Sequence, residues 1–393
     1  MRKIIILLIP IFFLTGCYDY RELSDLAIIT AVSIDKVDDN LEVTIQVVNP
    51  KKEQDTTSTN EPDFVTYTSY AKTVQEALRK VVNDSPAKLY ASHMELLVIS
   101  EEVAKNYLNE ILDFFSRDPE PRSEINIFIA KNANPKDELS VITPLINLPS
   151  TKILSSLESN VEYLGTSQDI TLNYVVDNYL NSYKELTLPI LELKGDANEG
   201  EKKDNISSGK TEASIILSNI GIFKDDKFIA YLSEKESQGV NFILNNINST
   251  IIEYVCEPNK YLVSEILKSN TSLEANLEKN TVKINLEGHA TISEITCNID
   301  IKNANTVKKI KENIDGTIEN IVEETFYNIR DKYNTDVFNF RDLYYKTDSK
   351  YFKDNYKDNW YNEIFPKLEI EVNANYKLYE KGSTLGGINY EQE

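Results

Sequence analysis

The last third of the chain contains a long amphipathic pattern: residues 307–329 read VKKIKENIDGTIENIVEETFYNI. Apolar side chains recur at helical spacing from Val307 to Ile329, which predicts one long helix with a single apolar face. Two segments on either side alternate apolar and polar residues, from Val282 to Glu287 and from Leu368 to Leu378 (LEIEVNANYKL), which predicts strands with one wet face. We therefore expect a long helix packed on an antiparallel sheet, as an α+β domain over residues 248–393.

The first part of the chain predicts another α+β domain, over residues 17–150. Its elements are expected in the order β-β-α-β-α-β, which indicates one mixed sheet with helices packed on it. The helix starts are marked by a capping box, Thr73-Val-Gln-Glu76, and by Ser100 followed by two glutamates. The expected elements are a hairpin at 26–34 and 41–48, a helix after Thr73, a buried strand at 89–99, a helix that begins at Ser100 and stops before Asp118-Pro119, and a strand at 125–130.

Between these two parts we expect a middle domain over residues 151–247. Two short helices and an extended segment, Leu186–Leu193, come first, and residues 195–211 are polar enough to be a loop or linker. A hairpin is expected to turn at Asp225-Asp226, and the capping box Ser233-Glu-Lys-Glu236 begins a helix. The predicted fold class is thus α+β, with three domains that each pack helices on a mixed or antiparallel sheet.

The N-terminus, MRKIIILLIPIFFLTGC, predicts how the protein is held in place. Arg2 and Lys3 precede an apolar run of eleven residues, Ile4–Leu14, which is shorter than the ~20 residues of a bilayer-spanning helix and is typical of a secretory signal. Leu14-Thr15-Gly16-Cys17 is a lipobox, in which the cysteine thiol is acylated and becomes the new N-terminus. We predict a signal peptide at 1–16 and lipid attachment at Cys17. The alternatives are a plain signal peptide with a chance cysteine, or an uncleaved anchor.

The composition is strongly acidic, with 63 Asp and Glu against 42 Lys and Arg and a formal net charge of −21. Such a chain is repelled by nucleic acid and by anionic lipid headgroups, so we expect no nucleic-acid partner. Membrane attachment should come from the acylated Cys17 and not from a basic patch. The acidic residues are distributed along the chain, which is typical of solvated faces and does not by itself indicate a binding site.

Catalytic patterns are weak in the sequence. Carboxylate pairs of the kind that hydrolyse glycosides are the open alternative, but among so many acidic residues no pair is singled out. The only two histidines, His93 and His289, lie in apolar, strand-like segments without Cys or His at ligand spacing, and we interpret His93 as a satisfied histidine of a buried strand. No HExxH, Walker or GxGxxG motif is present. Cys256 and Cys297 both follow β-rich runs, so they could form a disulfide, although the lack of a dense cysteine framework favours two separate thiols. We predict no cofactor, no metal and no enzymatic activity.

The segment from Tyr344 to Tyr361 is rich in aromatic residues interleaved with lysines. It resembles a stacking platform for bases or sugars, but it also contains three aspartates. A helix that packs its aromatic side chains on the sheet is the better interpretation.

Several segments resemble the Ger(x)C-type lipoproteins, the C subunits of spore germinant receptors. The resemblance spans nearly the whole chain, and the motifs occur in the family's order. They are CYDYREL (17–23), DLAIITAVSIDK (25–36), KLYASHMELLVISEE (88–102), ILDFFSRDP (111–119), GIFKDDK (221–227), LSEKESQG (232–239), DNW (358–360) and FPKLE (365–369). One departure is VFNFRD (337–342), where glycines are expected at the positions of Asn339 and Arg341.

The resemblance implies a non-catalytic, three-domain lipoprotein on the outer face of the spore inner membrane, associated with the receptor's A subunit and its transporter-like B subunit. Binding of a small-molecule germinant by this chain itself is doubtful. The alternative from another class is a lipid-anchored extracytoplasmic solute-binding protein, which would usually have two parallel-sheet lobes. The predicted hairpins and one-sided strands argue against it.

Tyr231 and Leu232 are our candidates for partner-binding residues. They precede the capping box at Ser233, so they should lie at a domain edge, where buried aromatic and aliphatic anchors supply most of the affinity of an interface. The alternative is that both residues only fix the following helix onto its own domain.

Overall fold

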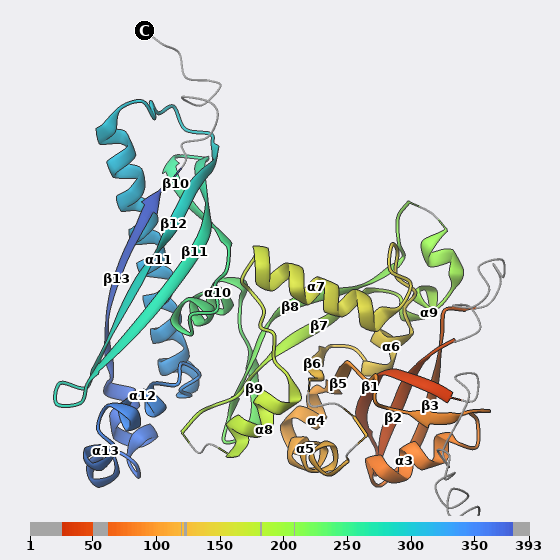
Figure 1. Cartoon of the computed structure of the whole chain (residues 1–393). Coiled ribbons are helices and arrows are strands. Elements are labelled where there is room, and N and C mark those ends of the chain that lie inside the picture. Colours follow the sequence, from red (N-terminus) through yellow and green to blue (C-terminus); the bar gives the residue numbers. More distant parts are fainter. Residues whose placement is uncertain are drawn as a thin grey trace, which may run out of the picture.

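The structure is a computed structural model that describes residues 26–49, 62–118, 120–121, 124–180, 183–207 and 209–379. The strands of these residues form two sheets, of nine and four strands. Figure 1 shows the two sheets with helices packed on them. The predicted α+β fold class is confirmed. Among the described residues, no helix combines the length and the apolar character that crossing a bilayer requires.

The larger sheet is mixed and spans residues 26–231. Its strand order is β3-β2-β1-β5-β6-β7-β8-β9, and β4 pairs with the start of β1. The central strands β1, β5, β6 and β7 run parallel, and the strands at both ends are antiparallel. The strands are β1 (Leu26–Val37), β2 (Asn40–Val48), β3 (Phe64–Ala71), β4 (Lys88–Tyr90), β5 (Leu96–Ser100), β6 (Asn126–Lys131), β7 (Thr187–Gly195), β8 (Ala213–Lys224) and β9 (Lys227–Tyr231).

Helices cover both faces of this sheet. One core contains Ala77, Ile111 and Val175, from the helices α3 (Val74–Val81), α5 (Leu108–Arg117) and α8 (Leu172–Leu180), and it also includes α4 (Glu101–Asn106). The core on the other face contains Leu139 and Ile153, from α6 (Pro135–Ser140) and α7 (Pro149–Tyr163). The predicted linker at 195–211 includes two single-turn elements, α9 (Ala197–Gly200) and η3 (Lys203–Ile206).

The smaller sheet has the order β10-β11-β12-β13, and the long predicted helix is confirmed as α11 (Ala304–Tyr333). The predicted antiparallel arrangement is wrong for one pair, because β13 runs parallel to β12. The connection through α11 returns the chain to the starting end of β12, which makes the two strands parallel. The remaining elements are β10 (Thr250–Glu257), β11 (Lys260–Asn276), β12 (Thr281–Ile295), β13 (Glu369–Leu378), α12 (Phe340–Thr347), α13 (Ser349–Asn355), η4 (Trp360–Ile364) and η5 (Phe365–Lys367).

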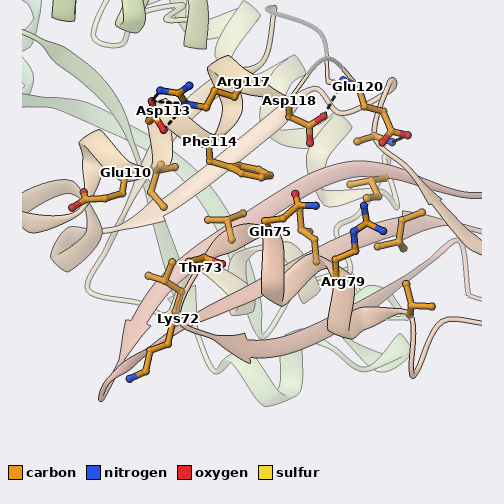
Figure 2. A pocket seen from close by; sticks show the side chains of 18 of the residues that line it. Lys72, Thr73, Gln75, Arg79, Glu110, Asp113, Phe114, Arg117, Asp118 and Glu120 are labelled. Carbon is orange, nitrogen blue, oxygen red and sulfur yellow. Dashed lines mark hydrogen bonds and ion pairs between the residues drawn. The ribbon is translucent and has the colours of Figure 1, made fainter.

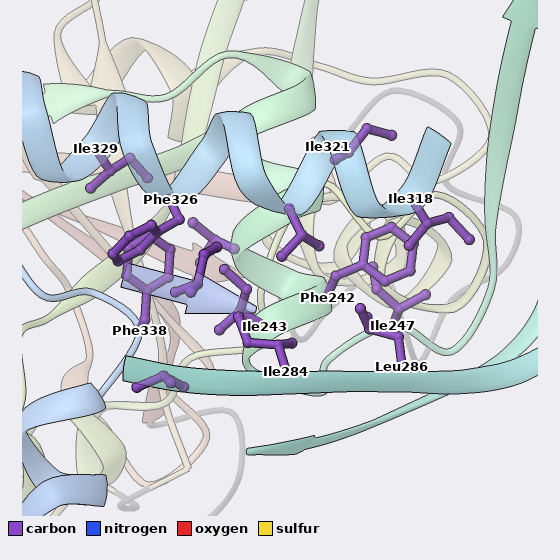
Figure 3. Packing of buried hydrophobic residues seen from close by; sticks show 14 of the residues in the cluster. Phe242, Ile243, Ile247, Ile284, Leu286, Ile318, Ile321, Phe326, Ile329 and Phe338 are labelled. Atoms are coloured by element: carbon purple, nitrogen blue, oxygen red, sulfur yellow. The ribbon is translucent and has the colours of Figure 1, made fainter. Parts of the chain in front are cut away.

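The two sheets share a core. Ile220 and Ile222 of β8 belong to the same buried cluster as α11 and the inner face of the smaller sheet. Helix α10 (Glu234–Ile243) lies between them, and Figure 3 shows its Phe242 and Ile243 packed between α11 and β12. Gly239 allows α10 to approach α11 closely, since a Cβ at this position would lie 2.1 Å from Oγ1 of Thr325. The capping box predicted at Ser233 and Glu236 is confirmed.

The predicted domain limits remain a proposal. The limit at residue 150 falls between β6 and β7, which are hydrogen-bonded neighbours in the larger sheet. The limit at residue 247 falls between α10 and β10, and α10 itself packs in the core of the smaller sheet.

Some local expectations differ from the structure. The predicted order of elements lacks β3, and the predicted strand at 89–99 is divided into β4 and β5 by a turn. The interpretation of His93 as part of a buried strand is wrong, because His93 is exposed in this turn. The predicted helix after Ser100 is interrupted at Tyr107. Three aromatic residues of the 344–361 segment are buried in the core, as expected: Tyr344, Phe352 and Trp360 are all at most 1% exposed, whereas Tyr351 is exposed.

The two cysteines form a disulfide, so the interpretation as separate thiols is wrong. Cys256 near the end of β10 is bonded to Cys297 after β12, with their Cα atoms 6.3 Å apart. The pairing depends on the chain after β12 lying beside the start of β11, where the Thr296 N–H donates to the Tyr261 carbonyl at 3.0 Å. This long-range geometry has no signal in the local sequence.

Candidate functional site

A groove of about 1290 Å³ lies on the larger sheet. Its two sides are α3 and α5, and its floor includes Ile29 of β1 and Leu41 of β2. The segment from Ser85 to Ala91, which contains β4, closes one end. We call this cavity the α3–α5 groove.

The groove exists because both helices have apolar residues on more than one face. Helix α3 buries Ala77 against the sheet, whereas Val74, Leu78 and the exposed Val82, which follows the last residue of α3, line the groove. Helix α5 buries Ile111 and Phe115, and Figure 2 shows Phe114 projecting from it over the groove.

Both signs of charge surround this apolar floor. Asp113 and Arg117 of α5 form an i,i+4 ion pair, with Arg117 Nε 2.9 Å from both carboxylate oxygens, and this bonding lowers the pKa of Asp113. Lys72 lies 3.7 Å from Asp39 on the opposite rim.

Two further cations of the groove, Arg79 and Lys88, have no ion-pair partner among the described residues. Figure 2 shows Arg79 extending from α3 into the groove. The groove thus offers unpaired positive charge on a chain that is acidic overall.

The chemistry of the groove suits binding. Its lining contains neither histidine nor cysteine, and its acidic side chains lie on the exposed rim. In the described part of the chain, no three His, Cys, Asp or Glu side chains gather closely enough to hold a metal ion. An apolar floor with charged edges is typical of grooves that receive the apolar face of a helix or peptide.

Tyr231 and Leu232 lie inside the molecule. Leu232 is 3% exposed and belongs to the core shared by the two sheets. Tyr231 is partly buried, and burial raises the pKa of its hydroxyl. The hydroxyl also donates to Oε2 of Glu101 at 2.8 Å, which raises this pKa further. Lys131 Nζ lies 5.1 Å from the centre of its ring. This placement favours the alternative in which both residues fix the helix onto the body of the protein.

A buried carboxyl cluster joins the two sheets. Glu185, just before β7, accepts hydrogen bonds from the hydroxyl of Tyr361 and from the Asp225 N–H. Burial raises the pKa of Glu185 to about 7. Asp336, after α11, accepts the N–H groups of Phe340 and Arg341, yet its complete burial raises its pKa to about 8.

We expect this cluster to make folding stability depend on pH. A carboxyl whose pKa is raised on folding keeps a proton that the unfolded chain releases, so the free energy of unfolding should fall as pH rises from about 4.5 to 8. For Glu185, a pKa raised from 4.5 to about 7 corresponds to on the order of 3 kcal/mol.

The variant Glu185→Gln should show a shallower pH dependence, because its amide cannot ionise and can still bond to Tyr361 and Asp225. Urea unfolding at several pH values between 5 and 8.5 measures this slope. Glu110→Gln, at an exposed position on α5, is the control. Equal slopes for the native chain and Glu185→Gln would contradict the expectation.

Cys17, the predicted lipid-attachment residue, lies outside the described residues, so its acylation remains a prediction. The α3–α5 groove was not predicted from sequence. The available signal was an excess of apolar residues on the two helices: Val82, at the end of α3, is 56% exposed.

These features define a two-sheet α+β protein whose candidate site is a binding groove. Two family models match the chain in order: a spore germination protein N-terminal domain over residues 19–193, and a spore germination B3/GerAC-like C-terminal domain over residues 218–382. The chain belongs to this GerAC family of spore germination proteins, which confirms the predicted resemblance.

Individual relatives agree with this assignment. The chain is 26% identical to spore germination protein KC of Bacillus subtilis (strain 168), over 96% of this chain and 95% of the relative. It is 25% identical to spore germination protein B3 of the same organism, over 67% of each chain. The crystal structure of the GerBC protein has the same fold, with a TM-score of 0.56 and 17% identity over 89% of this chain and 97% of that one.

Proposed function

We propose that this protein is the membrane-anchored C subunit of a spore germinant receptor and that it acts by binding partner subunits, without catalysis. The observation that carries the proposal is the ordered match of both family domains, together with a relative that aligns over 96% of the chain. In this proposal the partners are the receptor's A and B subunits. The protein is held by acylated Cys17 on the outer face of the spore inner membrane.

The position of the α3–α5 groove supports a role near the membrane. Leu26, the first residue of β1, pairs with Lys88, which lines the groove. Leu26 follows Cys17 by nine residues, and an extended chain spans at most about 3.5 Å per residue. A chain anchored at Cys17 would therefore have the start of β1, and this end of the groove, within about 30 Å of the bilayer. A segment of a membrane subunit could reach it there.

The size of the groove favours a peptide segment over a small solute. Its volume of about 1290 Å³ exceeds the roughly 300–1,000 Å³ of most small-molecule sites. The solute-binding alternative also expects two lobes with parallel sheets, whereas the smaller sheet here has only one parallel pair among its described strands. We therefore propose that the groove receives an amphipathic segment of a partner subunit.

The variant Val82→Glu tests this role, because it places a carboxylate over the apolar floor while changing a side chain that is already 56% exposed. We expect recovery of the A and B subunits with the tagged protein to fall by roughly tenfold, the effect of losing about 1.4 kcal/mol of binding free energy. The melting temperature should change little. The measurement is quantitative mass spectrometry of complexes purified from spore membranes.

The matched control is Leu180→Glu at the end of α8, where another aliphatic side chain is 77% exposed outside the groove. It should leave the recovery unchanged. Equal recovery with Val82→Glu and with the native chain would refute the groove as a docking site. If the native chain itself recovers neither subunit, the proposed receptor function is wrong.

A further inference from the structure

The smaller sheet has a second face that is not covered by α11. Residues that point toward α11, such as Ile252, Leu262 and Ile266, are at most 1% exposed. Their neighbours along β10 and β11 point the other way, and the large apolar ones remain in solvent: Ile251 is 50%, Val255 65% and Tyr261 39% exposed. Exposed apolar side chains that gather in one place indicate an interaction surface.

Apolar side chains and carboxylates lie next to one another on this surface. Along β10 the outward-facing residues alternate, as Ile251, Glu253 and Val255, and across the strands the pairing places an apolar residue beside a carboxylate in two of three rows. Glu265 of β11 lies between Ile251 of β10 and Thr291 of β12, Val263 lies between Glu253 and Glu294, and Tyr261 lies opposite Val255. We call these eight residues the outer face.

The three carboxylates of the outer face lack a cation. Glu253, Glu265 and Glu294 form no ion pair among the described residues. Two lysines lie near the ends of the outer face. Lys260 forms an ion pair with Glu257, and Lys268 lies three residues after Glu265, the last outer-face residue of β11. Diagonal neighbours across strands are only about 7–8 Å apart. The carboxylates therefore repel one another until a positive group lies between them.

The outer face is also held rigidly. The Cys256–Cys297 disulfide joins the end of β10 to the chain beyond β12. Beside it, the Tyr261 N–H donates to Oγ1 of Thr296 at 2.6 Å, and the Thr296 N–H donates to the Tyr261 carbonyl. A preformed surface loses little conformational entropy on binding, so more of its contact energy contributes to affinity.

We propose that the outer face binds a protein partner through a segment in which lysine or arginine alternates with apolar residues. Charge complementarity selects this occupant. A second copy of the chain would bring the same carboxylates, and anionic lipid or nucleic acid would be repelled by them. A basic and apolar protein segment neutralises Glu253, Glu265 and Glu294 and covers Ile251, Val255 and Val263 at the same time. This proposal deepens the proposed function by adding a second docking surface.

The test is photo-crosslinking of the full-length protein in spores. A photoreactive benzoylphenylalanine replaces Tyr261, and the same residue replaces Tyr351 of α13 in the control, where the exposed fraction is nearly equal at 37%. We expect at least fivefold more adduct from position 261 than from position 351. Mass spectrometry should place the adduct in a partner peptide that contains lysine or arginine.

The carboxylates are then neutralised by Glu253→Gln, Glu265→Gln and Glu294→Gln in the variant that carries the photoreactive residue at 261. We expect the adduct to fall at least fivefold while the melting temperature is maintained. No adduct above the control, an adduct in a peptide without basic residues, or an adduct unaffected by neutralisation would each overturn the proposal. If the adduct forms with a basic protein that is not a receptor subunit, the outer face is supported and the proposed receptor function fails.

Discussion

Spores that carry Cys17→Ala are expected to lose the protein from the membrane fraction and to germinate poorly with nutrients. The physical reason is that acyl chains at Cys17 would supply the attachment that the acidic chain cannot obtain from anionic headgroups. Each buried CH₂ of an acyl chain contributes about 0.8 kcal/mol, so losing two or three chains removes far more binding energy than any surface contact replaces. Fractionation of spores with an antibody, together with a germination assay, measures both effects.

The control for this experiment restores the tether without the cysteine. A single transmembrane helix fused before residue 18 of the Cys17→Ala chain should return the protein to the membrane. If germination also returns, the lipid acts only as an anchor. Full membrane retention and normal germination of the unfused Cys17→Ala protein would disprove the predicted lipid attachment.

Gly239→Ala in α10 is expected to lower the folding stability of the protein. The new Cβ would lie 2.1 Å from Oγ1 and 2.6 Å from Cβ of Thr325, a residue of α11 that is 2% exposed. Two packed helices must separate to admit it, and overpacking of this kind typically costs about 1–3 kcal/mol. Thermal and urea unfolding of the purified chain measures the change.

Gly316→Ala is the matched control, because Gly316 also lies within a helix, α11, and an added Cβ there meets no atom within 4 Å. It should be neutral or stabilising by about 0.5–1 kcal/mol, the usual preference of a helix for alanine over glycine. Thr325→Ala combined with Gly239→Ala should recover part of the lost stability. If the two glycine variants were equally stable, the close approach of α10 and α11 would not require Gly239.

The elements that sequence analysis predicts correctly are those whose signal is local. The 3.6-residue period of α11 and the alternation along β13 need no knowledge of what they pack against. The capping box at Ser233 is likewise contained in four residues. Asn339 is an instructive case: a glycine was expected there, and the structure gives Asn339 a φ of +61°, a left-handed conformation that asparagine tolerates better than most residues.

The features that sequence analysis missed depend on distant partners. Parallel pairing of β13 with β12 is decided by the path of the chain through α11, and the Cys256–Cys297 bond by the course of the chain after β12. The groove could not be predicted because Val82 and Phe114 resemble core residues until the spacing of α3 and α5 is known. Strand β3 is rich in Thr and Ser, and it is a strand because its backbone pairs with β2.

The core shared by the two sheets has a mechanical consequence. Ile220 and Ile222 of the larger sheet, α10 and α11 pack in one cluster, so the α3–α5 groove and the outer face are parts of one continuous body. When a partner subunit binds one surface, the other surface is held at a fixed distance from that partner. The second contact then forms within the same complex. The effective concentration of the second binding site is in the millimolar range when the spacing of the two sites matches that of the partner. Two individually weak contacts can therefore give a stable assembly. The distance between the two surfaces could then select partners, because only partners whose binding segments have the matching spacing would bind both surfaces.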